Sequence, residues 1–375
     1  MAASRTFPPQ FALTAALLAW GLAPDSVRPR AADALLRSGK NRADLDRLEA
    51  GYYEHLLDTG RRLDDDAVTP PPAPFKDGPL AMKVEDLREC VLRPDLATTF
   101  RGARWTTNRL GLRDDGCEAG DAAGSYRVAV IGDSIGVGWG VHDGEGFEPR
   151  LERALDARSA DLGGPRVELL NLCVPGYAPG QRREHLERLG WSFGPDLVLY
   201  QATAADIGWD ERRLRALLPG GIGWDAPMYR EAIASGGLRP GDGPDRVRDA
   251  LKPRRLDILA GVYRAVVADA RGRGVPIGWV LLPRVGRPID PRERRSLVGL
   301  ATVAGFDPII DLSDAFDGLD PRSIAVGPDD YHPNADGHAI LARRLEAALA
   351  TRPGVPWTDP TESSRPGSAG GATRR

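Results

Sequence analysis

The chain has 375 residues, of which 42% are hydrophobic and 27% charged, and its formal net charge is −3. These values are typical of a globular protein with enough core for one large domain with extensions, or for two domains. Because the balance of charges is not basic, we expect no nucleic-acid partner.

The first 25 residues contain a short apolar run. It follows Arg5, spans residues 11–23 and is too short to cross a bilayer comfortably. The Gly-Leu-Ala at residues 21–23 has the small-x-small form of a signal-peptide cleavage site. We therefore favour an exported, periplasmic protein with this segment close to the membrane. An N-terminal apolar helix of a cytoplasmic protein is the alternative.

Residues 26–125 are predicted to form an N-terminal extension. Apolar residues recur at helical spacing between residues 31 and 60, and a proline-rich linker follows at residues 70–74. Residues 105–113 are predicted to form a short hairpin that turns near Asn108 to Gly111. This hairpin either brings Asn108 or Arg113 near the edge of a sheet or lies plainly on the surface.

Residues 127–140 (Arg-Val-Ala-Val-Ile-Gly-Asp-Ser-Ile-Gly-Val-Gly-Trp-Gly) begin as a buried strand and end in a turn that carries Ser134 among glycines. A helix pattern follows from about Phe147. An α/β fold presents a nucleophile in this way at the carboxyl edge of its sheet. A phosphate-binding loop is a weak alternative because the phosphate motifs are missing, and an ordinary glycine turn is the plain one. Asp133 is expected to brace the turn by hydrogen bonds.

Strands and helices alternate from Tyr126 onward. Continuous apolar strands between amphipathic helices indicate a parallel sheet covered on both faces. We predict an α/β protein, a flavodoxin-like three-layer α/β/α sandwich with a five-stranded parallel sheet and an N-terminal helical and β extension. The predicted strands are 127–132, 167–172, 196–201, 276–282 and 308–311, and the predicted helices are about 147–158, 180–190, 255–273, 290–304 and 335–350.

An insertion of about residues 210–254 lies between the third predicted strand and the helix that follows it. Because it follows the carboxyl end of a strand, we expect it at the ligand edge of the predicted sheet. Trp209 and Trp224 either stack on sugar rings or pack the insertion onto the body. Residues 352–375 are rich in Pro, Ser, Gly, Thr and Arg and are predicted to be a disordered tail. The main domain is accordingly predicted to span residues 126–351.

A second chemically suggestive stretch lies at residues 327–338. Asp329 stands three residues before His332, which is followed by a proline and by Asn334, a residue suited to cap the last helix. An imidazole can take the proton of a serine while a carboxylate fixes its tautomer. We therefore predict a triad of Ser134, Asp329 and His332, with Asp330 as the carboxylate that the spacing favours less.

The Gly-Asp-Ser at residues 132–134 and the Asp-x-x-His-Pro-Asn at residues 329–334 resemble the first and last blocks of the SGNH (GDSL-like) hydrolases. The resemblance spans about residues 126–349. It implies a serine hydrolase, without cofactor or metal, that cleaves or transfers an acyl group, in particular acetyl, of a carbohydrate ester or another small ester. The alternative is a non-catalytic protein of the same fold with a carbohydrate-binding or accessory role.

The resemblance also implies an oxyanion hole formed by the backbone N–H groups of Ser134 and Gly176. The family's third donor is an asparagine, and this sequence has Ala205 at that position. Loss of one such donor typically costs about 10²–10³ in rate. Either the activity is low, another group replaces the donor, or the site binds without turnover. The candidates for a replacement donor are Gln201, Thr203 and Asn108.

The three cysteines, Cys90, Cys117 and Cys173, match no zinc-binding pattern. In an exported protein, Cys90 and Cys117 would be able to form a disulfide. Cys173 follows the second strand close to the predicted site. It is either a buried thiol or an alternative nucleophile.

Overall fold

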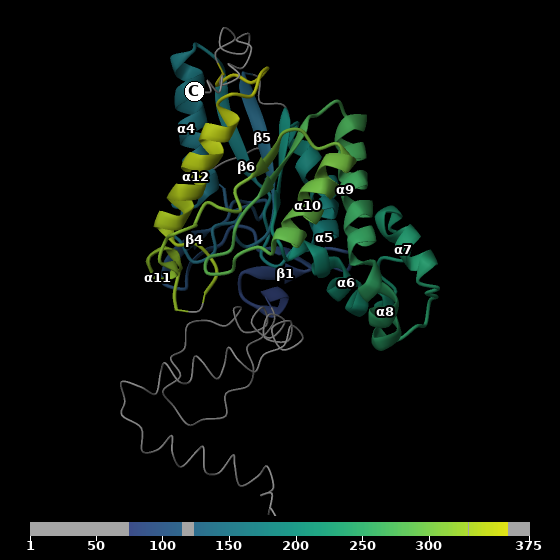
Figure 1. The fold of residues 1–375 in the computed structure, drawn as a ribbon. Helices are drawn as coiled ribbons and strands as arrows, with labels where there is room; N and C mark the ends of the chain where they lie inside the picture. Colours follow the sequence, from purple (N-terminus) through teal and green to yellow (C-terminus); the bar gives the residue numbers. More distant parts are fainter. Residues whose placement is uncertain (1–74, 115–123, 329, 359–375) are drawn as a thin grey trace, which may run out of the picture. The chain divides into compact units, whose positions relative to one another are not determined.

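The computed structural model of the chain describes residues 75–114, 124–328 and 330–358 (Figure 1). Its strands, helices and 3-10 helices (η) are, in chain order, η1 (Phe75–Asp77), β1 (Ala81–Lys83), β2 (Cys90–Leu92), β3 (Ala97–Phe100), β4 (Ala103–Thr106), β5 (Ser125–Ile131), α4 (Phe147–Asp161), β6 (Arg166–Asn171), α5 (Pro179–Arg188), η2 (Gly190–Phe193), β7 (Leu197–Ala202), α6 (Asp206–Leu217), η3 (Leu218–Gly220), η4 (Pro227–Tyr229), α7 (Arg230–Ser235), α8 (Pro244–Leu251), η5 (Lys252–Arg254), α9 (Arg255–Gly272), β8 (Ile277–Leu281), α10 (Pro291–Ala304), β9 (Ile309–Asp311), α11 (Pro321–Ile324) and α12 (Ala335–Leu349).

Several predicted segments lie outside the described residues. They are the N-terminal apolar run, the helices expected between residues 31 and 60, and the linker at residues 70–74. The proposed boundaries of the N-terminal extension and of the main domain therefore stay predictions. Within the described ranges, no helix has both the length and the apolar character needed to cross a membrane.

A five-stranded parallel sheet with the order β6-β5-β7-β8-β9 forms the centre of the fold. From β5 the chain first adds β6 on one side and then β7 on the other. The strand order thus reverses between β5 and β7, and ligands of open α/β sheets bind at the carboxyl edge of such a switch point. The predicted flavodoxin-like fold is confirmed.

Helices cover both faces of this sheet (Figure 1). On one face α4 and α12 lie side by side, and Leu151 and Leu345 share a core cluster with Val128 of β5. On the other face α5, α9 and α10 form a second cluster, in which Leu259 packs with Ala129. Because successive residues of β5 enter opposite clusters, the strand needs a continuous apolar run, which is the pattern that predicted it.

The predicted strands and helices of the sandwich agree with β5 to β9 and with α4, α5, α9, α10 and α12 to within three residues. The insertion, by contrast, was predicted without helices and contains most of α6 together with α7 and α8. Its apolar side chains, among them Leu214, Met228 and Val247, form a third cluster separate from the two layers on the sheet.

The hairpin predicted around residues 108–111 is wrong. The antiparallel pair is β3 with β4, and the turn between them consists of Arg101 and Gly102, whose φ angles are 51° and 81°. Two successive residues with positive φ are typical of a tight hairpin turn. Asn108 instead closes a separate turn, because its backbone N–H donates to the Leu112 carbonyl at 2.9 Å.

The chain remains packed beyond α12. Trp357 is fully buried, its Nε1 donates to the Leu349 carbonyl at 3.1 Å, and its ring meets Tyr126 edge-on at 5.5 Å. The prediction of a disordered tail is therefore wrong for residues 352–358, and residues 359–375 lie outside the described part of the chain.

Cys90 is a buried free thiol in β2. The disulfide considered between Cys90 and Cys117 in an exported protein is thus not supported, and Cys117 itself lies outside the described residues. Burial raises the pKa of the Cys90 thiol to about 12, so the group stays protonated at neutral pH.

Candidate active site

The turn that carries Ser134 follows β5 directly and requires glycine at two places. A Cβ atom at Gly132 would collide with the Gln201 side chain, and one at Gly136 would collide with Cys173. The turn is closed by a hydrogen bond from the Trp139 N–H to the Ser134 carbonyl at 3.1 Å. Close packing against Gln201 and Cys173 therefore explains Gly132 and Gly136 on either side of the serine.

Asp133 braces this turn, as expected. Its Oδ1 accepts a hydrogen bond from the Ile135 N–H at 2.9 Å, and its own backbone N–H donates to Gln201 Oε1 at 2.9 Å. Its Oδ2 lies 3.4 Å from the Arg182 guanidinium. The backbone N–H and both carboxylate oxygens of Asp133 thus have partners, which hold this neighbour of Ser134 in place.

Arg182 of α5 lies buried beneath the turn and was not singled out by the sequence analysis. It donates to both carboxylate oxygens of Asp206, at 2.9 and 3.0 Å, and to the Gln201 carbonyl at 2.9 Å. Burial by itself would lower the pKa of Arg182, but the carboxylates of Asp206 and Asp133 hold it well above its usual value. Arg182 therefore stays charged and ties the end of β7 and the start of α6 to the turn that follows β5.

Ser134, His332 and Asp330 form a continuous chain of contacts. Ser134 Oγ lies 2.7 Å from His332 Nε2, and His332 Nδ1 lies 2.7 Å from Asp330 Oδ1. All three residues are buried, and the structure brings together ends of the sandwich that are 198 residues apart in sequence. Burial would raise the pKa of Asp330, but hydrogen bonds from His332 and the charge of Arg101 hold it below its usual value. The carboxyl is therefore ionised at neutral pH.

The carboxylate in this chain of contacts corrects our prediction, which preferred Asp329 to Asp330. Asp330 Oδ1 accepts both from the His332 ring and, at 2.8 Å, from the His332 backbone N–H. A spacing of two residues allows one oxygen to make both contacts, as in an Asx turn. Asp329 itself lies outside the described residues.

Two aromatic rings flank the imidazole. Trp139, from the turn after Ser134, stacks on His332 with the ring centroids 5.4 Å apart and the planes 29° apart. The neighbouring Tyr331 lies 4.1 Å from the same ring at 31°. Packing of this kind restricts the rotation of the imidazole between Ser134 and Asp330.

The groups expected to form an oxyanion hole follow β5, β6 and β7. In the described part of the chain, the backbone N–H groups of Ser134 and Gly176 have no hydrogen-bond acceptor. Gly176 has a φ of 77°, which favours glycine, and its carbonyl accepts from Arg213 at 2.9 Å. Ala205 lies at the start of α6, is 8% exposed and offers no side-chain donor.

The three side chains predicted as replacement donors differ in their hydrogen bonds. Gln201 Oε1 is bonded to the serine turn, and its Nε2 is buried without a partner in the described part of the chain. Thr203 Oγ1 lies 3.5 Å from Asp206 Oδ1. Asn108 Oδ1 accepts from two backbone N–H groups of its own turn, each at 3.0 Å. Which group, if any, supplies a third donor stays a prediction.

Cys173 packs beneath the serine turn and is fully buried. Burial raises the pKa of its thiol well above the usual value, with a further contribution from Asp133. A protonated, inaccessible thiol is a poor nucleophile. Cys173 is therefore a buried thiol, which favours that interpretation over the alternative nucleophile.

The two tryptophans considered as sugar platforms pack against protein instead. Trp209 is 6% exposed and lies beneath the Arg213 guanidinium at 5.8 Å. Trp224 is partly buried and donates through Nε1 to the Leu218 carbonyl at 2.8 Å. Their main role is thus to hold the helical insertion together and to the body.

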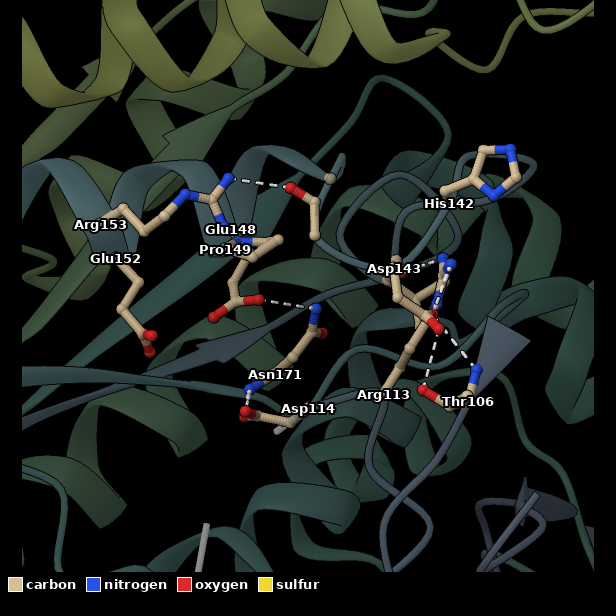
Figure 2. Close-up of a pocket in the computed structure, with 13 residues that line it drawn as sticks. Thr106, Arg113, Asp114, His142, Asp143, Glu148, Pro149, Glu152, Arg153 and Asn171 are labelled. Carbon is tan, nitrogen blue, oxygen red and sulfur yellow. Dashed lines mark hydrogen bonds and ion pairs between the residues drawn. The ribbon is translucent and has the colours of Figure 1, made fainter. Parts of the chain in front are cut away.

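A cavity of about 100 Å³ is lined by Val137 of the serine turn together with residues of α4 and β6, among them Glu148 and Asn171 (Figure 2). Asn171 projects into it and donates both to the Gly136 carbonyl and to Glu148 Oε2, each at 3.2 Å. Arg113, buried on another wall, donates to the Val137 carbonyl at 3.1 Å. Arg113 therefore lies near the sheet edge, as one of our two interpretations had it. These polar side chains support the turn through its backbone carbonyls.

A flavodoxin-like sheet with a serine after β5 that contacts a histidine and, through it, an aspartate before α12 has the arrangement of α/β hydrolytic proteins. Residues 130–340 match the model of the GDSL-like lipase/acylhydrolase family. The chain belongs to this family of ester-hydrolysing enzymes, and the resemblance to the SGNH (GDSL-like) hydrolases is confirmed. No curated protein matches the chain by sequence.

Several solved structures are similar to the chain. The psychrotrophic esterase EstA from Pseudoalteromonas sp. is 14% identical, covers 60% of this chain and 96% of its own, and has a TM-score of 0.38. A catalytic mutant of the acetylxylan esterase Axe2 from Geobacillus stearothermophilus is 19% identical, with 62% and 96% covered and a TM-score of 0.40. A two-domain esterase active on acetylated mannans is 15% identical, with 66% and 54% covered and a TM-score of 0.39.

Proposed function

We propose that this protein is a serine esterase in which Ser134 is the nucleophile, His332 the general base and Asp330 the carboxylate that orients the base. The observation that carries the proposal is the pair of 2.7 Å contacts that joins Ser134 to His332 and His332 to Asp330. A serine hydroxyl becomes a useful nucleophile when a base within hydrogen-bond reach takes its proton.

The reaction begins when Ser134 Oγ attacks the carbonyl carbon of the ester and its proton passes to His332 Nε2. Asp330 keeps the other ring proton on Nδ1 and stabilises the imidazolium that forms. The same imidazolium then gives its proton to the departing alcohol, which leaves an acyl group on Ser134. A water molecule, deprotonated by His332, releases the acid and restores the enzyme.

The backbone N–H groups of Ser134 and Gly176 are proposed to bind the oxyanion of the tetrahedral intermediates. Both groups lack an acceptor within the described residues, so neither has to break a bond first. Because Ala205 cannot donate, we expect a rate about 10²–10³ below that of a site with a third donor.

We propose an ester with a short acyl group, acetyl above all, as the substrate. A nucleophile that is only 6% exposed favours a short acyl group over a long one. The alcohol part is proposed to be a carbohydrate or another small molecule. If a sugar hydroxyl replaces water in the second step, the same residues catalyse acyl transfer.

The competing proposal is a binding protein that has kept the fold without turnover. Ala205 favours it, since the family's asparagine donor is missing at this position. The continuous contacts from Ser134 to Asp330 favour the enzyme, because a binding role does not need a base on the serine.

Turnover of p-nitrophenyl acetate tests the proposal without knowledge of the natural ester. We expect the purified protein to release p-nitrophenol in many turnovers, and Ser134→Ala and His332→Ala to abolish this activity while remaining folded by circular dichroism. Butyrate and octanoate esters should be cleaved progressively more slowly. Equal rates for the wild type and both variants would contradict the proposed function.

A further inference from the structure

We propose that Arg101, in the turn between β3 and β4, is a positioning residue of the active site that holds the outer oxygen of the Asp330 carboxylate. The inference rests on the proposed function, in which Asp330 orients His332. The Arg101 guanidinium lies 3.2 Å from Asp330 Oδ2. Arg101 thus brings a segment that precedes the whole parallel sheet in sequence into contact with the triad.

The two oxygens of Asp330 are held in different ways. Oδ1 accepts from the ring and from the backbone of His332. Oδ2 is buried and, within the described residues, has no hydrogen-bond partner, so the ion pair with Arg101 is what balances it. A carboxylate fixed at one oxygen can still rotate about that contact. Arg101 restricts this rotation and keeps Oδ1 directed at the imidazole.

The hairpin that carries Arg101 is firmly attached to the serine turn. Phe100 meets Trp139 edge-on at 4.6 Å, and Trp139 itself stacks on His332. Farther along β4, the Arg104 N–H donates to His142 at 3.0 Å, and the Thr106 hydroxyl donates to Asp143 at 2.9 Å. The position of Arg101 is therefore determined by contacts with the same loop that carries the nucleophile.

The backbone at Arg101 supports a role for its side chain. Its φ of 51° lies in the left-handed region, where hairpin turns strongly prefer asparagine, aspartate or glycine. Arginine is locally unfavourable there, and the Arg101 side chain is only 22% exposed. An arginine that is unfavourable in this turn is better explained by its ion pair with Asp330 than by the needs of the turn.

The charged groups around the His332–Asp330 pair are few in the described part of the chain. Arg101 faces Asp330 from the hairpin, and Arg284 lies over the Tyr331 ring at 5.4 Å from its centroid. His338 of α12 also interacts electrostatically with His332, but burial lowers the pKa of His338 to about 3, so it is neutral. Asp133 directs its carboxylate to Arg182 instead. Arg101 therefore partly neutralises the carboxylate that attracts the imidazolium proton, as well as orienting it.

The test compares Arg101→Asn and Arg101→Lys with Arg104→Asn in p-nitrophenyl acetate hydrolysis. Asparagine tolerates the left-handed backbone, so Arg101→Asn removes the guanidinium without straining the turn. Arg104 is a matched control, because it belongs to the same hairpin but its side chain is 75% exposed and pairs with Asp143 at 3.4 Å.

We expect Arg101→Asn to lower kcat about tenfold with little change in KM. The test also measures kcat as a function of pH. The acid limb of this profile should move up by about 0.5–1 pH unit in Arg101→Asn, since a carboxylate without its cation favours the protonated imidazolium. Arg101→Lys should keep the acid limb in place and recover most of kcat. Arg104→Asn should match the wild type throughout.

An Arg101→Asn variant with wild-type kcat and an unmoved acid limb would overturn the inference while leaving the proposed function intact. A loss of activity that comes with a lowered melting temperature and an unmoved acid limb would also overturn it, because it would show a purely structural role. If the wild type itself has no activity, the proposed function fails first and the inference with it.

Discussion

The carboxylate that contacts His332 belongs to Asp330, two residues before it. We therefore expect opposite results from substitution of Asp330 and of its neighbour Asp329. Asparagine at position 330 cannot hold the imidazole in the tautomer with the proton on Nδ1. We expect Asp330→Asn to lower kcat for p-nitrophenyl acetate by about 10³–10⁴. Asp329→Asn is the matched control and should retain activity. A large loss in Asp329→Asn with an active Asp330→Asn would refute the assignment.

Ala205 offers the converse test, in which a substitution increases the activity. Asparagine at this position would supply the side-chain donor that the family places there. We expect Ala205→Asn to raise kcat by about tenfold or more. Ala205→Leu has a side chain branched at the same atom but without a donor, and it should give no gain. Similar rates for the two variants would show that the hole is complete without this donor.

The functional residues that were predictable from sequence are those with a local signature. Ser134 follows a strand in a glycine-rich turn, and His332 precedes a proline and a helix cap, so both could be recognised along the chain. Arg182 and Arg101 act through contacts with segments far away in sequence, for which no spacing rule exists. Asp329 and Asp330 differ by one position, and only the backbone geometry decides between them.

At the scale of elements, the contact between α6 and the 3-10 helix η4 contains a buried carboxyl. Asp210 Oδ1 accepts from the Tyr229 hydroxyl at 2.6 Å and from the Gly180 N–H at 3.0 Å. Burial raises the pKa of Asp210 to about 6, compared with 3.8 for an ordinary aspartate. The folded state therefore holds this proton more tightly than the unfolded state does.

This pKa shift makes the stability depend on pH. The contribution of Asp210 to the free energy of unfolding is complete below pH 3.8 and is lost as the pH rises through about 6. An asparagine in its place would keep both acceptor contacts without titrating. Between pH 4 and pH 7, urea unfolding should therefore show Asp210→Asn gaining about 2 kcal/mol relative to the wild type.

The control for this pH effect is Asp249→Asn on α8, whose side chain is 65% exposed. This variant should follow the wild type at both pH values. If the difference between Asp210→Asn and the wild type is the same at pH 4 and pH 7, Asp210 does not titrate between them and the account of this contact is wrong.

The parallel sheet and its covering helices were predictable because a strand buried on both faces must be apolar throughout. The hairpin was misplaced because Arg101-Gly102 is an unusual turn pair, whereas Asn108 to Gly111 has the residues that turns prefer. The helices of the insertion were missed since their apolar side chains pack mainly on one another, with glycines and prolines between short segments.

At the scale of the whole molecule, the end of the described chain helps to close the sandwich. Trp357 connects the last turn of α12 to Tyr126 of β5. Truncation of a fully buried aromatic side chain typically costs about 3–5 kcal/mol, so Trp357→Ala should lower the free energy of urea unfolding by about 4 kcal/mol. Trp357→Phe, which keeps the ring contact, should lose less than half of this. An unchanged midpoint in Trp357→Ala would contradict the packing of this segment.

The segments before and after the sheet thus contribute to one folded unit with it. The hairpin shares the core cluster of β5 through Phe100 and Trp105, and the C-terminal segment shares it through Trp357. Composition suggested a tail from residue 352 because the residues beyond Trp357 dominate the average. A single tryptophan was enough to extend the packed region.

Activation of Ser134 by His332 can be tested by labelling with a fluorophosphonate, because this reagent requires no known substrate. We expect one covalent adduct per protein, located on Ser134 by peptide mass spectrometry and absent from Ser134→Ala and His332→Ala. A folded wild-type protein that takes up no label, or one labelled at another residue, would contradict it and favour the binding role.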